Sequence, residues 1–197
     1  MDDKPSTLVI CCGAVAREVV GLVRDNGWDH MKVECLPAKL HNDPDKLPEG
    51  VRAKIRAGRD EFDTVLVLYS DCGTGGGMEK VLEEEGVEGI GGAHCYEIFT
   101  GAQNFAEIMD EEAGCFFVTD FLARQFEKLV FKGLALDRFP KLRNVYFKNY
   151  RKLVYLAQSE DAELKRRAEA AAESVGLEFE IRYTGESGYD RFLSARQ

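Results

Sequence analysis

Short apolar runs alternate with segments of helical periodicity along most of this chain. The clearest run, at residues 63–69, leads into a glycine-rich stretch and then into a helical segment at residues 78–85. The run at residues 7–12 is followed in the same way by a glycine and by a helical segment at residues 14–25. Strands that alternate with helices form βαβ units, in which the strands run parallel. The alternation therefore predicts an α/β fold built on a mostly parallel sheet.

The remaining elements follow from the same two patterns. Aromatic and β-branched residues at 115–119 predict a strand, and the Ala-, Glu- and Arg-rich stretch 161–174, which stops before Gly176, predicts a helix. Further strands are expected at residues 32–36, 89–93, 153–157 and 177–183. Further helices are expected at residues 48–57, after 94–97, at 120–133 and after a turn at 185–188, and a loop is expected at 41–48.

Two segments with a matching pattern favour an internal duplication. Residues 15–23 align at one fixed offset with residues 122–130, sharing an Ala-Arg pair and a Leu-Val pair, and each segment follows a short predicted strand. If this is a duplication, residues 1–113 and 114–197 form two similar Rossmann-like lobes, packed as one compact unit with a ligand cleft between them. If the match is a coincidence, the cleft is not expected.

Charge and hydropathy limit the classes of function. The net charge of −9 argues against broad electrostatic binding to nucleic acid or to an anionic membrane. No apolar stretch approaches the roughly 18 residues that span a bilayer, and the polar first residues do not resemble a signal peptide. We therefore expect a cytoplasmic protein that binds a small-molecule ligand or a protein partner.

Cysteine and histidine residues follow several predicted strands at the point where each strand ends. Cys12 ends the first strand, Cys72 follows the strand at residues 63–69, and His94 and Cys95 follow the next short strand. In a parallel sheet these carboxyl ends meet at one edge, which is where α/β proteins bind ligands. Thiolate and imidazole are ligands of Zn²⁺, and thiolate also suits other thiophilic metals. The sequence therefore predicts a metal site at this edge.

A single ion needs several of these donors. The expected ligands are Cys72, His94 and Cys95, with Cys12 or His41 as the fourth. Successive side chains of a strand point to opposite faces, so only one of Cys11 and Cys12 can reach the site, and Cys12 is nearer the loop. The adjacent residues His94 and Cys95 can share one ion only if the chain turns sharply, which Gly91 and Gly92 make easy.

Two alternatives to a metal site stay open. The cysteines can be small buried apolar residues, which is the role expected of Cys35 and Cys115 inside predicted strands. Alternatively, Cys72 is a catalytic nucleophile that His94 activates without a metal. The sequence has no Cys-X-X-Cys pair, so the signal is convergence in space rather than a contiguous motif.

Other polar residues are candidates for ligand binding at the same edge. The glycine-rich segment 73–77 either presents backbone N–H groups to an anion or forms a tight turn, and it lacks the spacing of a P-loop or dinucleotide motif. Arginine can hold a carboxylate or phosphate, and aromatic segments can line a pocket. The candidate ligand-binding residues are Gly73, Thr74, Gly75, Arg17, Asp120, Arg124, Tyr150 and Arg151.

Blocks of sequence at these strand ends are similar to one family of archaeal and bacterial proteins. In combination they extend over roughly residues 8–185. The blocks are Cys11-Cys12-Gly13-Ala14 with Ala16-Arg17-Glu18, Leu36-Pro37-Ala38 with Leu40-His41-Asn42, Tyr69-Ser70-Asp71-Cys72-Gly73-Thr74-Gly75-Gly76, His94-Cys95-Tyr96-Glu97, Thr119-Asp120-Phe121-Leu122-Ala123-Arg124, and Asn149-Tyr150-Arg151 with the residues up to Gln158. The chain thus resembles domain-of-unknown-function family 1638.

That resemblance implies no assigned activity, but it does imply an association with corrinoid-dependent methyltransferase systems of anaerobes. Together with the expected donors, it leads to the hypothesis of a zinc–thiolate protein that serves methyl transfer or corrinoid metabolism. A non-catalytic module that delivers metal or corrinoid to a methyltransferase or corrinoid protein is the second hypothesis, and a metal-free Cys/His enzyme is the third. The expected cofactors are zinc or another thiophilic metal, and a corrinoid.

Overall fold

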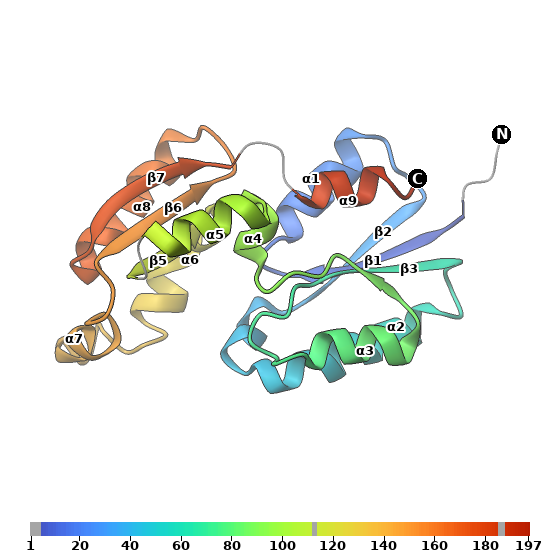
Figure 1. The fold of residues 1–197 in the computed structure, drawn as a ribbon, viewed down its shortest axis with the longest axis horizontal. Helices are drawn as coiled ribbons and strands as arrows, with labels where there is room; N and C mark the ends of the chain where they lie inside the picture. Colours follow the sequence, from blue (N-terminus) through green and yellow to red (C-terminus); the bar gives the residue numbers. More distant parts are fainter. Residues whose placement is uncertain (1–4, 112–113, 185–187) are drawn as a thin grey trace. The chain divides into compact units, whose positions relative to one another are not determined.

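The computed structural model describes residues 5–111, 114–184 and 188–197. The chain divides into two compact units, of which unit 1 comprises Met1–Ile98 and Gly188–Gln197 and unit 2 comprises Phe99–Ser187. Each unit has its own parallel β-sheet flanked by helices (Figure 1), which confirms the predicted α/β fold with parallel sheets. The boundary expected after residue 113, which itself lies outside the described residues, differs from this division at both ends of unit 2.

Unit 1 is built on parallel strands in the order β2-β1-β3-β4. The strands are β1 (Thr7–Cys12), β2 (Met31–Leu36), β3 (Thr64–Leu68) and β4 (Glu88–Gly89). The helices are α1 (Ala16–Asp25), the 3₁₀ helix η1 (Ala38–Asn42), α2 (Leu47–Gly58), α3 (Gly77–Glu85), α4 (Cys95–Thr100), which continues into unit 2, and α9 (Gly188–Ser194). Figure 1 shows α1 and α9 on one face of this sheet and α2 and α3 on the other.

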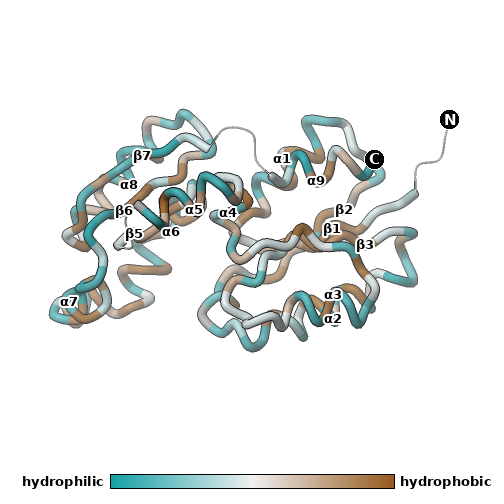
Figure 2. The backbone as a smooth tube through the Cα atoms, in the orientation of Figure 1, coloured by the Kyte–Doolittle hydropathy of each residue, from teal (hydrophilic) through white to brown (hydrophobic). Residues whose placement is uncertain are grey.

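Burial explains why the first strand is apolar on both faces. Every residue of β1 is buried, because β1 lies between β2 and β3 and helices cover both faces of the sheet. Figure 2 shows this strand in brown. The strand predicted at residues 89–93 is wrong in extent, since β4 ends at Gly89. Gly91 and Gly92 adopt positive φ values of 70° and 86°, a conformation that a strand does not contain.

Unit 2 is built on three parallel strands in the order β5-β6-β7. The strands are β5 (Cys115–Thr119), β6 (Lys152–Ala157) and β7 (Glu178–Tyr183). The helices are α5 (Ala102–Glu111), α6 (Asp120–Phe126), which continues as a π-helical turn over Glu127–Phe131, α7 (Arg143–Tyr146) and α8 (Ala162–Val175). The turn expected at 185–188 lies largely outside the described residues.

The sheet of unit 2 is covered on both faces. On one face α6 and α8 pack together over a core that includes Val118 and Tyr155. On the other face, Phe105 of α5 packs against Phe117 of β5 with ring centroids 5.5 Å apart. Val118 and Phe117 are neighbours on one strand, so their opposite directions follow from the two-residue period of a strand. This unit therefore has a three-layer arrangement of its own.

The proposed duplication is not visible in the strand order. In both units a strand leads directly into a helix, β1 into α1 and β5 into α6. However, β1 pairs with strands on both sides, whereas among the described residues β5 pairs only with β6. The local likeness therefore does not extend to sheet topology. Superposition of α1 on α6 and a ligand cleft between two lobes stay predictions.

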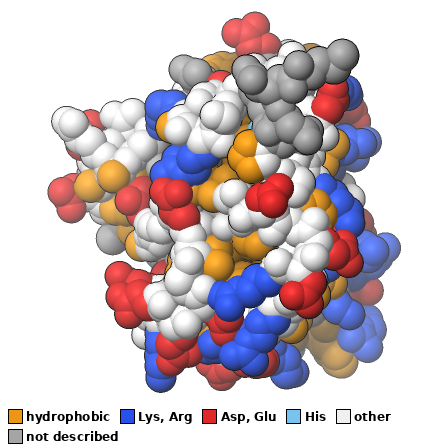
Figure 3. Space-filling model, turned by 90° about the vertical axis from the view of Figure 1, so that its right-hand side faces the viewer, with side chains coloured by type: hydrophobic (Ala, Val, Ile, Leu, Met, Phe, Trp, Pro, Cys, Tyr) orange, Lys and Arg blue, Asp and Glu red, His pale blue; other side chains and the backbone are white. Residues whose placement is uncertain are grey.

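The surface shows how the charge is distributed. On the face drawn in Figure 3, acidic and basic side chains are interspersed, with hydrophobic side chains between them. Interspersed charges of opposite sign keep the local electrostatic potential low. Within the described part of the chain, no helix combines the length and the apolar character needed to cross a bilayer.

Candidate metal centre

Two backbone hydrogen bonds fix the position of Cys72 at the carboxyl edge of the sheet. The N–H of Asp71 donates to the carbonyl of Gly92 at 2.9 Å, and the N–H of Cys72 donates to the carbonyl of Ala93 at 3.0 Å. These two bonds join the segment that follows β3 to the segment that follows β4. They hold Cys72 against the residues that come after Ala93.

A turn that contains two glycines brings His94 and Cys95 close to Cys72. Gly91 and Gly92 both have positive φ, which glycine adopts without steric cost. The carboxylate of Glu97, in the first turn of α4, accepts the N–H of Ala93 at 2.9 Å and fixes the turn. The chain therefore turns sharply before α4, as two adjacent ligands require.

The donor atoms of Cys72, His94 and Cys95 all lie within 4.8 Å of one another. Two ligands of one tetrahedral zinc ion lie about 4 Å apart when the Zn–S bonds are about 2.3 Å long. The donors thus need to move by less than about 1 Å to reach zinc geometry. Among the residues that the structure describes, no other group of three His, Cys, Asp or Glu donors comes this close.

Cys12 and His41 form a second pair beside these three residues. The sulfur of Cys12 lies 3.7 Å from Nδ1 of His41 and 4.0 Å from Nε2. His41 lies in η1 rather than in the expected loop, and its Nδ1 lies 3.2 Å from the carbonyl oxygen of Ala38. If Nδ1 donates to that oxygen, Nε2 is the nitrogen that can bind a metal once it has lost its proton. Cys12 and His41, the two candidates for the fourth ligand, therefore both lie next to the three donors.

One thiol of the cluster is a thiolate at neutral pH. A hydrogen bond from the thiol of Cys95, and then contact with His41, lower the pKa of Cys72 to about 4 despite its partial burial. The same interaction with Cys72, together with burial, raises the pKa of Cys95. The negative charge of the pair therefore lies on Cys72 and the proton on Cys95.

The two histidines of the cluster have opposite charge states. Contacts with Cys12 and then with Cys72 raise the pKa of His41 to about 10, so this imidazole is cationic at neutral pH. Burial lowers the pKa of His94, which is neutral and ready to act as a ligand. Because metal ligands must be deprotonated, ion binding here displaces the proton of Cys95.

The backbone of Cys72 is strained. Its φ of 48° lies in the left-handed region, which residues other than glycine adopt at a cost of about 1–3 kcal/mol. Strain of this kind persists where the surrounding structure fixes it, and it is common at functional sites. The two hydrogen bonds to the segment 92–93 supply that constraint at Cys72.

Sequence reasoning missed two hydroxyl groups next to the cluster. Tyr69 and Ser70 are each only 2% exposed, and within the described part of the chain neither hydroxyl has a hydrogen-bond partner. Burial, and then the neighbouring Cys12 thiol, raise the pKa of Tyr69. Buried hydroxyls are normally satisfied, so the hydroxyl of Ser70 is available to a ligand, whereas that of Tyr69 interacts with the thiol of Cys12. The only feature of the sequence that could have indicated them as site residues was their position directly after β3.

The glycine-rich segment forms a tight turn. Asp71 accepts the hydroxyl of Thr74 and the N–H groups of Gly75 and Gly76, the latter two at 3.1 and 2.8 Å. Gly73 and Gly75 have φ values of +88° and +62°. The amides of Gly75 and Gly76, which could have faced an anion, are bonded to Asp71 instead. This favours the tight-turn interpretation over phosphate binding.

Most of the other candidate ligand-binding residues lie in unit 2 and do not belong to this sheet. Arg17 is in unit 1, where it is exposed on α1. The strand at 115–119 belongs to the second sheet, so the expectation that its carboxyl end meets the same edge as the cysteines is wrong. The candidates that belong to unit 2 are Asp120, Arg124, Tyr150 and Arg151.

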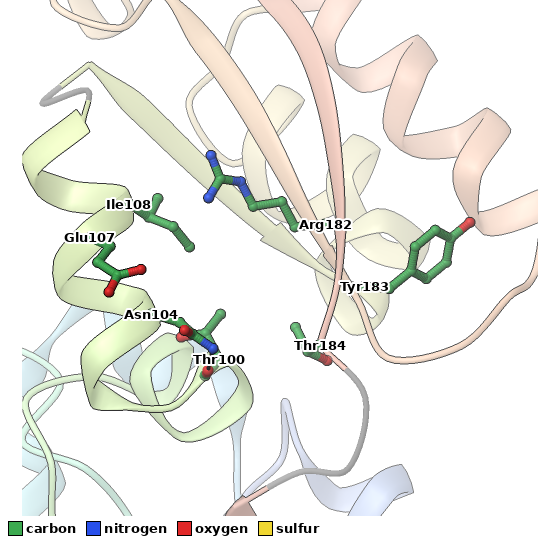
Figure 4. Close-up of a pocket in the computed structure, with 7 residues that line it drawn as sticks. All are labelled: Thr100, Asn104, Glu107, Ile108, Arg182, Tyr183 and Thr184. Carbon is green, nitrogen blue, oxygen red and sulfur yellow. Dashed lines mark hydrogen bonds between the residues drawn. The ribbon is translucent and has the colours of Figure 1, made fainter.

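Each unit has a cavity with room for a small ligand. One, of about 490 Å³, lies in unit 1, where Tyr69, Asp71 and Met78 contribute to its lining. The other, of about 200 Å³, lies in unit 2 (Figure 4). Figure 4 shows Arg182 pointing toward the helix that carries Glu107, and Tyr183 pointing the other way. The lining of the first cavity includes Asp71, the chain neighbour of Cys72, but none of the three donors of the candidate metal centre.

Comparison with known proteins places the chain in a family. A family model described as "Protein of unknown function (DUF1638)" matches residues 35–192. The chain belongs to this family. The DUF1638 match confirms the resemblance seen in the sequence and includes His41, Cys72, His94 and Cys95, while Cys12 precedes it. Searches of curated proteins and of solved structures found no match.

Proposed function

We propose that this DUF1638 protein binds a thiophilic metal ion, in the first place zinc, through Cys72, His94 and Cys95. The observation that carries the proposal is the separation of at most 4.8 Å among three donors of the types that zinc prefers. Three protein ligands leave a fourth position, as in catalytic rather than closed structural zinc sites. Cys12 or His41 completes that shell or flanks it.

The chemistry that suits such a site is thiol activation. Zinc lowers the pKa of a thiol that it binds and keeps the sulfur nucleophilic at neutral pH. His41 lies beside Cys72, where its charge stabilises thiolate sulfur. The cavity lined by Tyr69 offers space for a small substrate. We propose methyl transfer to a thiol as the reaction class, with a corrinoid protein as the methyl donor. The support for a corrinoid protein as the donor is the family resemblance.

Cobalt substitution tests the proposal. Co²⁺ titrated into metal-free protein should give thiolate-to-cobalt charge-transfer bands that saturate at one ion per chain, because two cysteines are ligands. Addition of 2-mercaptoethanol should then change the spectrum if the fourth position is open. Cys115→Ser, in unit 2, should behave as wild type, whereas absence of thiolate bands in the wild type would contradict the proposal.

A metal-free nucleophile is the second candidate function. The observation that favours it is the pKa of Cys72, which Cys95 and His41 lower to about 4. A thiolate of this kind resembles those of cysteine enzymes paired with an imidazolium. The activating histidine would be His41 rather than His94, because His94 is neutral.

The pH dependence of alkylation tests the charge state of Cys72 in the metal-free protein. A depressed pKa keeps the thiolate present as the pH falls from neutrality, so the iodoacetamide rate at Cys72 should stay flat until the pH approaches about 4. A cysteine with the ordinary pKa of about 8.5 would slow tenfold per pH unit below that value.

Two comparisons complete this experiment. His41→Gln should shift the titration of Cys72 upward, because it removes a stabilising cation. Added Zn²⁺ should block alkylation of Cys72 if the metal proposal holds. Unchanged alkylation in saturating Zn²⁺ would leave the metal-free nucleophile as the better account, and a rate that falls tenfold per unit from pH 8 would exclude the thiolate.

A further inference from the structure

Cys11 and Cys35 form a second pair of thiols, outside the candidate metal centre. They are in register on the neighbouring strands β1 and β2, and their sulfur atoms lie 3.4 Å apart. Cys11 adjoins Cys12 in the chain, but consecutive side chains of a strand point to opposite faces of the sheet. The pair therefore lies on the face opposite to Cys12.

The backbone spacing of the pair suits a disulfide. Neighbouring strands lie about 4.7–4.9 Å apart, and disulfides join residues whose Cα atoms are about 4.4–6.8 Å apart. To form a bond of about 2.05 Å, the sulfurs must approach by about 1.4 Å from their present separation of 3.4 Å. Rotation about the Cα–Cβ bonds can supply much of that movement without separating the strands.

The two thiols differ in access and reactivity. Cys11 is fully buried in the central strand, whereas Cys35 is half-buried on β2, which is at the edge of the sheet. The hydrogen bond from Cys11, and then the charge of Lys54, lower the pKa of Cys35 to about 7. An accessible thiol of low pKa beside a buried one is the arrangement of an attacking and a resolving cysteine.

We propose that Cys11 and Cys35 form a redox-active dithiol that reduces small-molecule disulfides. The sulfur of Cys35 attacks one sulfur of the disulfide, whose S–S bond breaks and releases the first thiol. Cys11 then loses its proton and attacks the sulfur of Cys35, which forms the Cys11–Cys35 bond and releases the second thiol. The two cysteines together lose two electrons and two protons, and the small disulfide gains them.

Peptide mapping after treatment with oxidised glutathione tests the proposal on the full chain. The reduced protein is exposed to the reagent, quenched in acid, alkylated and digested with trypsin. Wild type should yield a disulfide between the peptide that ends at Arg17 and the peptide 33–39, together with two equivalents of glutathione. Because Cys11 and Cys12 share the first peptide, Cys12→Ser should retain this link and Cys11→Ser should lose it.

The variants also separate the two cysteine roles. In Cys11→Ser, Cys35 should accumulate as the glutathione adduct, since the resolving thiol is missing. Cys35→Ser, at the more exposed position, should give neither adduct nor link in this pair while still binding metal. Failure of the metal proposal leaves these outcomes unchanged, since they involve different cysteines. Persistence of the link in Cys11→Ser, or a wild type in which Cys35 stays free or carries only glutathione, would overturn the dithiol.

Discussion

Replacing Cys72 with serine should remove stoichiometric metal from the protein. An alcohol is a far weaker anionic ligand than a thiol at neutral pH, and of the two thiols in the cluster Cys72 is the one that is already deprotonated. We expect metal affinity to fall by more than about 100-fold, since even residues that only support a ligand are worth 10–100-fold. Elemental analysis of untagged, anaerobically purified protein measures the metal content, and competition with a chromophoric chelator measures the affinity.

The matched control is Cys115→Ser. Cys115 begins β5 in unit 2 and is not a member of the cluster. The Cys115→Ser variant also loses one cysteine sulfur, but from outside the cluster, so its metal content should equal that of wild type. Equal trace amounts of metal in wild type and in both variants would contradict the site, as would equal stoichiometric binding by all three.

Replacing Asp120 with alanine should destabilise unit 2 by about 3 kcal/mol, because several buried donors would lose their acceptor. Asp120 is 8% exposed. Its Oδ1 accepts the hydroxyl of Tyr155 at 2.7 Å and the N–H of Gln158 at 3.1 Å, and its Oδ2 accepts the hydroxyl of Ser159 at 2.8 Å. The carboxylate thus joins the start of α6 to the end of β6. The midpoint of urea denaturation measures the loss.

Asp137→Ala is the comparison for this change. Asp137 is exposed in the same unit, so its replacement should alter the free energy of unfolding by no more than about 0.5 kcal/mol. If the two variants lose the same stability, the hydrogen bonds of Asp120 do not stabilise the unit. Sequence reasoning assigned Asp120 to ligand binding, but its contacts within unit 2 give it a structural role as well.

Local pattern was enough to locate most elements of the fold. The strands at residues 7–12 and 115–119 were predicted to the residue, because each apolar run is bounded by a glycine or an acidic residue. The strand predicted at residues 89–93 was wrong in extent, since the φ values of Gly91 and Gly92 depend on the turn that Glu97 fixes. Which strands share a sheet was also not predictable, because periodicity reports the faces of a strand and not its neighbours.

The candidate site, like the fold, could be predicted only in part from the sequence. Parallel topology was sufficient to bring Cys72, His94 and Cys95 to one edge, since the carboxyl ends of neighbouring strands meet there. The contact between Cys11 and Cys35 was not predictable, because it depends on the register of two strands that are separated in sequence. Cys35 was expected to be buried, but it is half-buried because β2 forms the edge of the sheet.

X-ray absorption spectroscopy of the zinc-loaded protein tests the central claim most directly. The proposed site predicts at least two sulfur ligands at about 2.3 Å and at least one nitrogen ligand at about 2.0–2.1 Å. A third sulfur would identify Cys12 as the fourth ligand, and a second imidazole would identify His41. Cys95→Ser should remove one sulfur from the shell. A zinc shell made only of oxygen and nitrogen, or a protein that retains no zinc after gel filtration, would contradict the metal centre.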